Sequence, residues 1–330
     1  MLIHAAVCPH PPLLVPELAG EAAPELDGLR AACARAVSRL ADAVAAAAGA
    51  GADAEIVVVG GARRTRRFGA RAVASLRPYG LITPILNGES ESGISDTGGR
   101  SDPCFGQHEI GAVSDEDGAA SGTGPGEASG AEVLPLSLTI GRWLLRDVLE
   151  GLPDGVPVGF QAVADDASPE ECLRLGRELA GPADRRVALL VMGDGSACLN
   201  EKAPGYLDPR AEPYDAAVAE ALRTADASAL AALDPALSRE LWVAGRAAWQ
   251  VLAGAAGTAG AGSPDADTAD AGTVGGGAGG GAPLDAARSD AAGSGAAGSG
   301  AARFDAELLA YEAPYGVGYL VATWDGRPRP

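Results

Sequence analysis

An apolar segment near the start of the chain, residues 2–7, runs directly into a cluster of prolines. We predict that this segment forms a buried strand. Pro9, Pro11 and Pro12 end it, because proline lacks the N–H group that the interior of a sheet or helix requires. His10 is therefore expected on a stiff loop at the carboxyl end of a strand, where ligands usually bind in open α/β sheets. A fixed imidazole there suits a metal ligand or a proton shuttle.

Further apolar segments alternate with helical patterns along the chain. A β-branched run at residues 55–59 follows an amphipathic pattern over 21–48, and a strand, a helix and a second strand in this order are typical of a parallel sheet. Ser168, Pro169 and Glu171 form a capping-box pattern that predicts the start of another helix. The remaining predicted helices cover 140–149, 168–180, 212–222, 234–252 and 304–311, with a further helix capped by Asp226. The remaining predicted strands cover 156–163, 186–192 and 317–324.

Two segments have the composition of disordered chain. Residues 87–131 contain nine acidic residues and one arginine among many glycines and serines, and residues 254–302 consist mainly of Gly, Ala, Ser and Asp. Such segments bury too little apolar surface to offset the entropy lost on ordering, so we predict a disordered acidic insertion and a flexible linker. The sequence therefore indicates one α/β domain over residues 1–330, with a mostly parallel central sheet, helices on both faces and two low-complexity insertions.

The balance of charge limits the partners of this chain. It has 25 basic and 44 acidic side chains, a formal net charge of −19, which argues against nucleic acid or an anionic membrane as the main partner. Four arginines at 63, 64, 66 and 67 are an exception to this acidity. They either hold an anionic ligand or form a solvated basic loop.

The apolar runs and the cysteines indicate the cellular location and the redox state that we expect for this protein. The longest apolar runs are much shorter than the ~20 residues that a membrane span requires. The first residues lack the basic region of a signal peptide, so we expect a cytoplasmic protein. The five cysteines show no CxxC spacing, which favours reduced thiols over a zinc ribbon or a disulfide scaffold.

Polar residues also follow the predicted strand 186–192. Asp194 lies between two glycines, where it is either a turn residue or a carboxylate that faces the same crevice as His10. Asp194, Ser196 and Lys202 are residue types for metal-independent hydrolytic or transfer chemistry. Ser196 has no G-x-S-x-G motif around it, however, and Lys202, the only lysine, also fits an ordinary surface charge.

The strand that precedes residues 8–12 (Cys-Pro-His-Pro-Pro) carries a family resemblance. Together they resemble the start of the class III extradiol dioxygenases, namely their catalytic B subunit, and look closest to the B-like proteins related to it. The resemblance extends to residues 193–197 and 314–319. It implies a non-haem Fe(II) site with His10 as a ligand, and O2-dependent ring cleavage of a small aromatic, catechol-like substrate.

The sequence departs from the ring-cleaving enzymes at two histidines. Where the family has its second histidine ligand, this chain reads Gly-Gly-Ala at 60–62, and where the family has its acid/base histidine it reads Ala197. The resemblance implies a glutamate as the third ligand, for which Glu240 is the nearest candidate. The candidate metal ligands are thus His10, Asp194 and Glu240, an oxygen-rich set that binds Fe(II) more weakly and suits another divalent ion or none.

Two functions are left open by these residues. The first is an Fe(II)-dependent extradiol dioxygenase. The second is a non-catalytic relative that binds a small molecule or a protein partner in the retained crevice. The absence of the second histidine and the presence of Ala197 favour the second.

Overall fold

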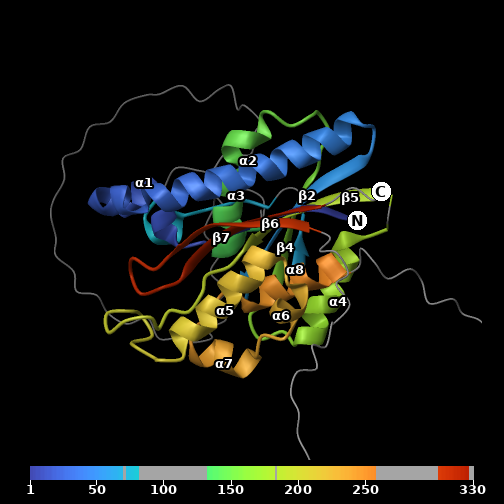
Figure 1. The fold of residues 1–330 in the computed structure, drawn as a ribbon. Coiled ribbons are helices and arrows are strands. Elements are labelled where there is room, and N and C mark those ends of the chain that lie inside the picture. Colours follow the sequence, from blue (N-terminus) through green and yellow to red (C-terminus); the bar gives the residue numbers. More distant parts are fainter. Residues whose placement is uncertain (70–71, 82–131, 183, 258–303, 327–330) are drawn as a thin grey trace, which may run out of the picture.

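The computed structural model describes residues 1–69, 72–81, 132–182, 184–257 and 304–326 (Figure 1). The predicted insertion at 87–131 lies outside the described residues, and so does the predicted linker from residue 258 onward. Within the described residues one sheet lies between two layers of helices, which confirms the predicted α/β class.

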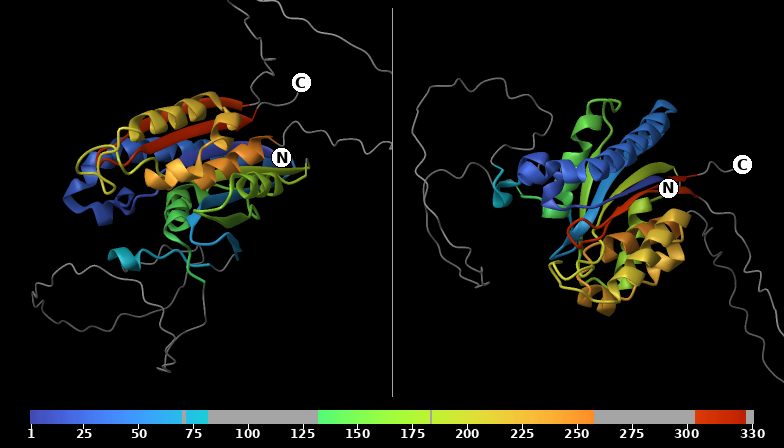
Figure 2. Two further views of the ribbon diagram at one scale, coloured as in Figure 1. Left: turned by 90° about the horizontal axis from the view of Figure 1, so that it is seen from below. Right: turned by 60° about the vertical axis from the view of Figure 1, so that its left-hand side comes forward.

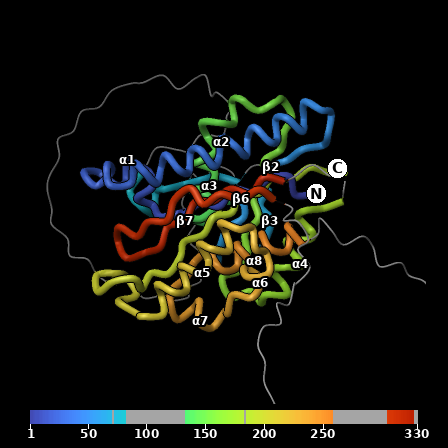
Figure 3. The backbone as a smooth tube through the Cα atoms, viewed as in Figure 1, coloured from blue at the N-terminus to red at the C-terminus, as the bar shows by residue number. Residues whose placement is uncertain are grey.

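A single sheet of seven strands forms the centre of the described structure. In chain order its strands are β1 (Leu2–Cys8), β2 (Asp53–Ala62), β3 (Arg66–Phe68), β4 (Val158–Ala164), β5 (Arg185–Met192), β6 (Phe304–Glu312) and β7 (Tyr319–Gly326). Their order across the sheet is β3-β4-β2-β5-β1-β7-β6. The central strands β4, β2, β5 and β1 are parallel, whereas β3 and the β6–β7 hairpin pair antiparallel at the two edges. Figure 3 traces this hairpin, in red, back to the sheet.

Helices cover both faces of the sheet, as predicted (Figure 2). In chain order they are α1 (Pro16–Ala19), α2 (Asp27–Gly49), α3 (Leu136–Leu149), α4 (Pro169–Ala180), α5 (Ala211–Thr224), α6 (Ala227–Ala231), α7 (Pro235–Glu240) and α8 (Arg246–Gly257), with 3-10 turns at Pro12–Leu14, Gly20–Leu26 and Arg77–Tyr79. Helices α2 and α3 pack on one face, and α4, α5, α6 and α8 on the other. No helix in the described ranges is both long and apolar enough to cross a membrane.

Side chains along the central strands point alternately to the two faces of the sheet and fill the core on each face. In β5 the odd-numbered residues from Val187 to Val191 pack with α4, α5 and α8, and the even-numbered residues from Ala188 to Met192 pack with α2 and α3. All of these side chains are completely buried. This explains the continuous apolar run in the sequence, because a strand covered on both faces needs apolar residues at every position.

The prediction of a helix over the C-terminal segment 304–311 is wrong, because this segment forms strand β6. Its residues favour a helix locally, since Ala, Leu and Glu are good helix formers. β6 instead forms an antiparallel ladder with β7 from Phe304 to Glu312. Pairing with a neighbouring strand therefore outweighs the local helix propensity.

The prediction of a single helix over 234–252 is also wrong, because α7 and α8 are separate helices. Between them Trp242 has a left-handed φ of 55°. The break docks on the loop after β5, where the Leu241 carbonyl accepts hydrogen bonds from Ser196 and Ala197. These bonds hold the break in place and let α8 start in a new direction.

The predicted linker starts too early, because residues 254–257 continue α8. Gly254 is buried against α4, where a Cβ atom would lie 2.2 Å from the Leu173 carbonyl oxygen. Gly176 faces α8 in the same way, since a Cβ atom there would lie 2.0 Å from the Val251 carbonyl oxygen. These glycines serve close helix packing, although by composition Gly254 is typical of a flexible segment.

We expect Gly176→Ala to lower the free energy of unfolding by about 1–3 kcal/mol, because the added methyl group overlaps backbone that cannot move aside cheaply. The matched control is Gly257→Ala at the end of α8, where a Cβ atom would meet nothing within 4 Å. This control should be neutral or slightly stabilising, since alanine favours a helix. Urea denaturation of both variants checks the prediction, and equal stabilities would contradict it.

Candidate functional site

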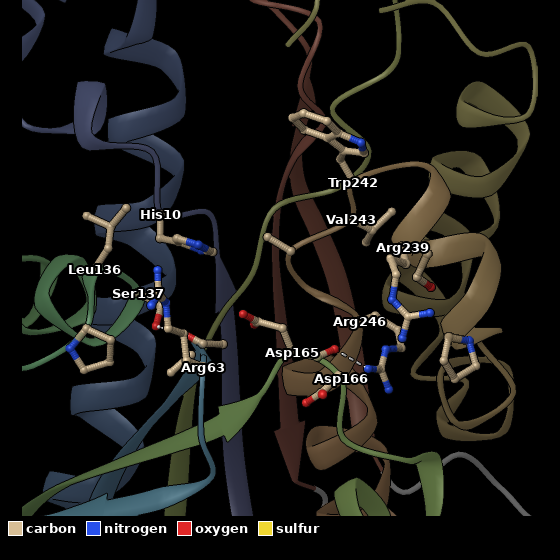
Figure 4. Close-up of a pocket in the computed structure, with 16 residues that line it drawn as sticks. His10, Arg63, Leu136, Ser137, Asp165, Asp166, Arg239, Trp242, Val243 and Arg246 are labelled. Carbon is tan, nitrogen blue, oxygen red and sulfur yellow. Dashed lines mark hydrogen bonds between the residues drawn. The ribbon is translucent and has the colours of Figure 1, made fainter. Parts of the chain in front are cut away.

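A cavity of about 500 Å³ opens at the carboxyl edge of the parallel strands. It is lined by the turns that follow β1, β2 and β4, by the first turn of α3, and by the segment from α7 to the start of α8. Figure 4 shows His10 and Ser137 on one side, with Asp165 and Arg246 facing them. This edge of a parallel sheet is where ligands bind in open α/β folds.

His10 forms part of the cavity wall and is only 9% exposed. Its backbone N–H donates a hydrogen bond of 2.7 Å to Oδ1 of Asp194. The ring nitrogen Nδ1 lies 3.7 Å from the same oxygen, too far for a hydrogen bond, and this buried atom has no partner among the described residues. An unpaired atom of this kind costs on the order of 1–3 kcal/mol. It has no accessible surface, so a ligand in the cavity would contact another part of the ring.

Asp165 follows β4 and points into the cavity towards His10 (Figure 4). Burial raises the pKa of this carboxyl, while positive charge on His10 and on Arg246 opposes the rise. Arg246 is only 3% exposed. Its guanidinium donates to the backbone carbonyls of Asp165 and Ala167 and to the side chain of Gln250. The carboxyl of Asp165 therefore holds its proton to a higher pH than an ordinary aspartate does.

Sequence reasoning missed Asp165, although a signal was present. The pair Asp165-Asp166 follows a predicted strand directly, as His10 and Asp194 do. Gly61 on β2 makes room for this carboxylate, because a Cβ atom at position 61 would lie 2.4 Å from Oδ1 of Asp165. The acidic pair is thus as strong a candidate as Asp194.

Asp194 and Ser196 both lie on the loop after β5 but have structural roles. Oδ1 of Asp194 accepts the His10 N–H, so this carboxylate fixes the loop that carries the imidazole. Ser196 is fully buried, and its Oγ donates to the Leu241 carbonyl at 2.9 Å and accepts from the Cys198 N–H at 3.1 Å. Neither residue lines the cavity.

Lys202 and Glu240 are exposed residues outside the lining of the cavity that contains His10. Lys202 is exposed, in a turn where its N–H donates to the side chain of Asn200. Glu240 at the end of α7 is exposed, and its carboxylate accepts a 2.7 Å hydrogen bond from Arg210. Neither side chain lines the cavity. Of the predicted site residues, the structure brings together only His10 and Asp194.

The positions of these residues show whether they could hold the Fe(II) that the family resemblance implies. The described residues contain no group of three or more His, Cys, Asp or Glu side chains placed to hold a metal ion. His10 lines the cavity and is a common type of metal ligand, but a facial triad also needs a second histidine and a carboxylate. The donor set that surrounds His10 does not fit Fe(II), so we derive no chemical step from the metal.

Comparison of the chain with protein-family models gave no match, and comparison with curated protein sequences gave none either. The resemblance to the B-like extradiol dioxygenases therefore stays a prediction. Function must be inferred from the geometry of the cavity.

A buried carboxyl on α5, Asp215, also escaped prediction. Its Oδ1 accepts the Ser196 N–H at 2.9 Å, whereas its Oδ2 is buried without a partner among the described residues. Burial raises the pKa of Asp215 to about 7, and the hydrogen bond from Ser196 opposes this rise. Asp215 supports the loop that carries Ser196, and through the same loop Asp194.

The raised pKa of Asp215 makes stability depend on pH. The folded protein keeps a proton that the unfolded chain releases above about pH 4, so this contribution is complete below pH 4 and is lost as the pH rises to about 7. Asp215→Asn cannot ionise. We therefore expect it to lose less stability than the wild type between pH 5 and 8, by on the order of 1–2 kcal/mol.

Urea denaturation at both pH values checks this expectation. Asp226→Asn is the matched control, because it makes the same chemical change at an exposed helix cap that asparagine serves equally well. The stability of this control should change with pH as that of the wild type does. Parallel pH profiles for Asp215→Asn and the wild type would contradict the role assigned to Asp215.

Proposed function

We propose that the cavity at the carboxyl edge of the sheet binds a small organic molecule, and that His10 forms a direct hydrogen bond to it. The observation that carries this proposal is the imidazole of His10, which lines the cavity with its ring directed into it (Figure 4). An imidazole carries hydrogen-bonding nitrogens, so the part of the ring that faces the cavity can bond a polar atom of a ligand. A volume of about 500 Å³ is also in the usual range for small-molecule sites.

An aromatic ligand is the best-supported class. Trp242 lines the cavity and is 59% exposed, so it offers an aromatic face at the rim. The sequence resemblance points to the same class, since it implies a catechol-like compound. In this proposal Asp165 lies opposite His10 as a proton donor or acceptor, and burial raises the pKa of its carboxyl above that of an ordinary aspartate.

The second candidate is an Fe(II)-dependent extradiol dioxygenase. His10 is the residue that favours it, because its imidazole lines the cavity at the expected strand end, although the described residues around it do not complete a ligand set. When bound, the metal would supply activation of O2 and of a catecholate. His10 would hold the metal, and Asp165 is better placed than Glu240 to add a carboxylate. For either activity we propose a cytoplasmic location, as the sequence predicts.

We expect catechol to bind to the full chain, and His10→Ala to weaken binding about tenfold or more, because the variant lacks the ring nitrogen that the ligand would bond. Isothermal titration calorimetry under nitrogen checks this. Arg35→Ala, an exposed change on α2 outside the cavity, is the control and should bind as the wild type does. Undiminished binding in His10→Ala would overturn the proposal.

The dioxygenase candidate has its own measurement. If this candidate is correct, elemental analysis of anaerobically purified protein finds near-stoichiometric iron that is lost in His10→Ala. Glu240→Gln should keep its iron, because this exposed carboxylate is paired with Arg210 outside the cavity lining. If the wild type and His10→Ala both lack iron, the dioxygenase candidate is ruled out and the binding proposal stands alone.

A further inference from the structure

Trp242, at the break between α7 and α8, has an unfavourable backbone conformation. Its φ of 55° is in the left-handed region, which a bulky residue rarely adopts because its Cβ atom crowds the backbone. The Trp242 N–H donates to the Arg239 carbonyl, and the Val243 N–H donates to the Ser238 carbonyl. This pair of bonds is a Schellman motif, in which glycine is the usual residue at the position of Trp242. The end of α7 therefore does not require a tryptophan.

The protein core does not account for this tryptophan either. Trp242 is 59% exposed, whereas Trp249 and Trp324 are completely buried. A tryptophan stabilises a fold mainly through the apolar area that it buries, and most of this area stays in water at Trp242. Backbone strain that the local structure does not need is typical of binding sites. The strained conformation and the exposure of Trp242 thus both point to a ligand.

Neighbouring loops hold the indole in place. The Leu241 carbonyl accepts hydrogen bonds from the Ser196 hydroxyl and the Ala197 N–H, which fix the backbone just before Trp242. Gly205, on the loop after β5, lies against the side chain, because a Cβ atom at position 205 would lie 3.4 Å from Cγ of Trp242. The indole is therefore positioned before any ligand arrives, and it lines the cavity.

The cavity is larger than one aromatic ring requires. Its volume is about 500 Å³, whereas a cavity of ~150 Å³ is enough to hold benzene. Figure 4 shows the indole at the opposite end of the labelled side chains from Arg63 and Asp166. A ring that contacts His10 and Asp165 therefore leaves space in the cavity beside Trp242.

We propose that Trp242 forms a second subsite of the cavity, and that the ligand is an elongated molecule with two aromatic rings. One ring carries polar substituents and lies at His10 and Asp165. The other ring is apolar and stacks on the Trp242 indole, which adds affinity beyond the area that it buries. Because the indole is already fixed, little side-chain entropy is lost on binding. This inference rests on the proposed function and deepens it, by naming the substrate class.

Catechol, 4-phenylcatechol and 4-cyclohexylcatechol are the probes. The last two differ only in whether the second ring is aromatic, so their relative affinity reports stacking. We expect the full-length wild type to bind 4-phenylcatechol about tenfold more tightly than catechol, because the second ring buries apolar area. We expect it to bind 4-phenylcatechol about threefold more tightly than 4-cyclohexylcatechol, because only the phenyl ring stacks. Isothermal titration calorimetry under nitrogen measures the three affinities.

Trp242→Phe and Trp242→Leu are the decisive pair of variants. Their new side chains have similar sizes and neither is β-branched, so both variants meet the same left-handed backbone with a similar cost. We expect Trp242→Phe to keep the preference for the phenyl over the cyclohexyl probe, and Trp242→Leu to lose it, because only phenylalanine offers an aromatic face. Equal preferences in the two variants would overturn the inference.

Tyr206→Leu is the matched control for a general effect on these loops. Tyr206 also has a left-handed φ, of 62°, and is 63% exposed, but it does not line the cavity. This variant should keep the preference of the wild type, and its loss here as in Trp242→Leu would overturn the inference. Equal affinities of the wild type for catechol and 4-phenylcatechol would reject the second subsite but leave the proposed function intact. Failure of all three probes to bind would reject both.

Discussion

Parallel hydrogen bonding among four strands brings the polar residues that follow their carboxyl ends to one edge of the sheet. β1 pairs with β5, β5 with β2 and β2 with β4, so the carboxyl ends of all four strands lie at one edge of the sheet. His10, Arg63, Asp165 and Asp194 follow these ends directly. His10 and Asp194 are 184 residues apart in the sequence and still share a hydrogen bond. The register is secure because a shift of one residue would exchange the two buried faces of each strand.

Much of this arrangement could be predicted from local pattern. The strands β1, β2, β4, β5 and β7 are all expected, because continuous apolar runs ended by proline, glycine or charged residues are typical of strands buried on both faces. The same rule places His10 at a strand end. If this rule were applied to every strand, it would also predict Asp165 as a site residue, because Asp165 follows β4 as His10 follows β1.

The remaining features depend on tertiary contacts that no local pattern contains. β6 has helix-favouring residues and is a strand only because β7 lies beside it. The burial of Arg246 could not be predicted, since its partners are backbone carbonyls on the turn after β4. The roles of Ser196 and Asp215 were hidden for the same reason: their hydrogen bonds hold a loop against α5 and the α7–α8 break.

The region beside Gly61 shows how the cavity differs from a site with two histidines. The resemblance implies a histidine within residues 60–62, yet a Cβ atom on Gly61 would lie 2.4 Å from Oδ1 of Asp165. A side chain at 61 and this carboxylate therefore exclude each other. The Asp165 carboxylate occupies the space beside Gly61, opposite His10. The cavity is thus built around one imidazole, one carboxyl and the indole of Trp242, a set of groups better suited to binding a polar aromatic ligand than to enclosing Fe(II).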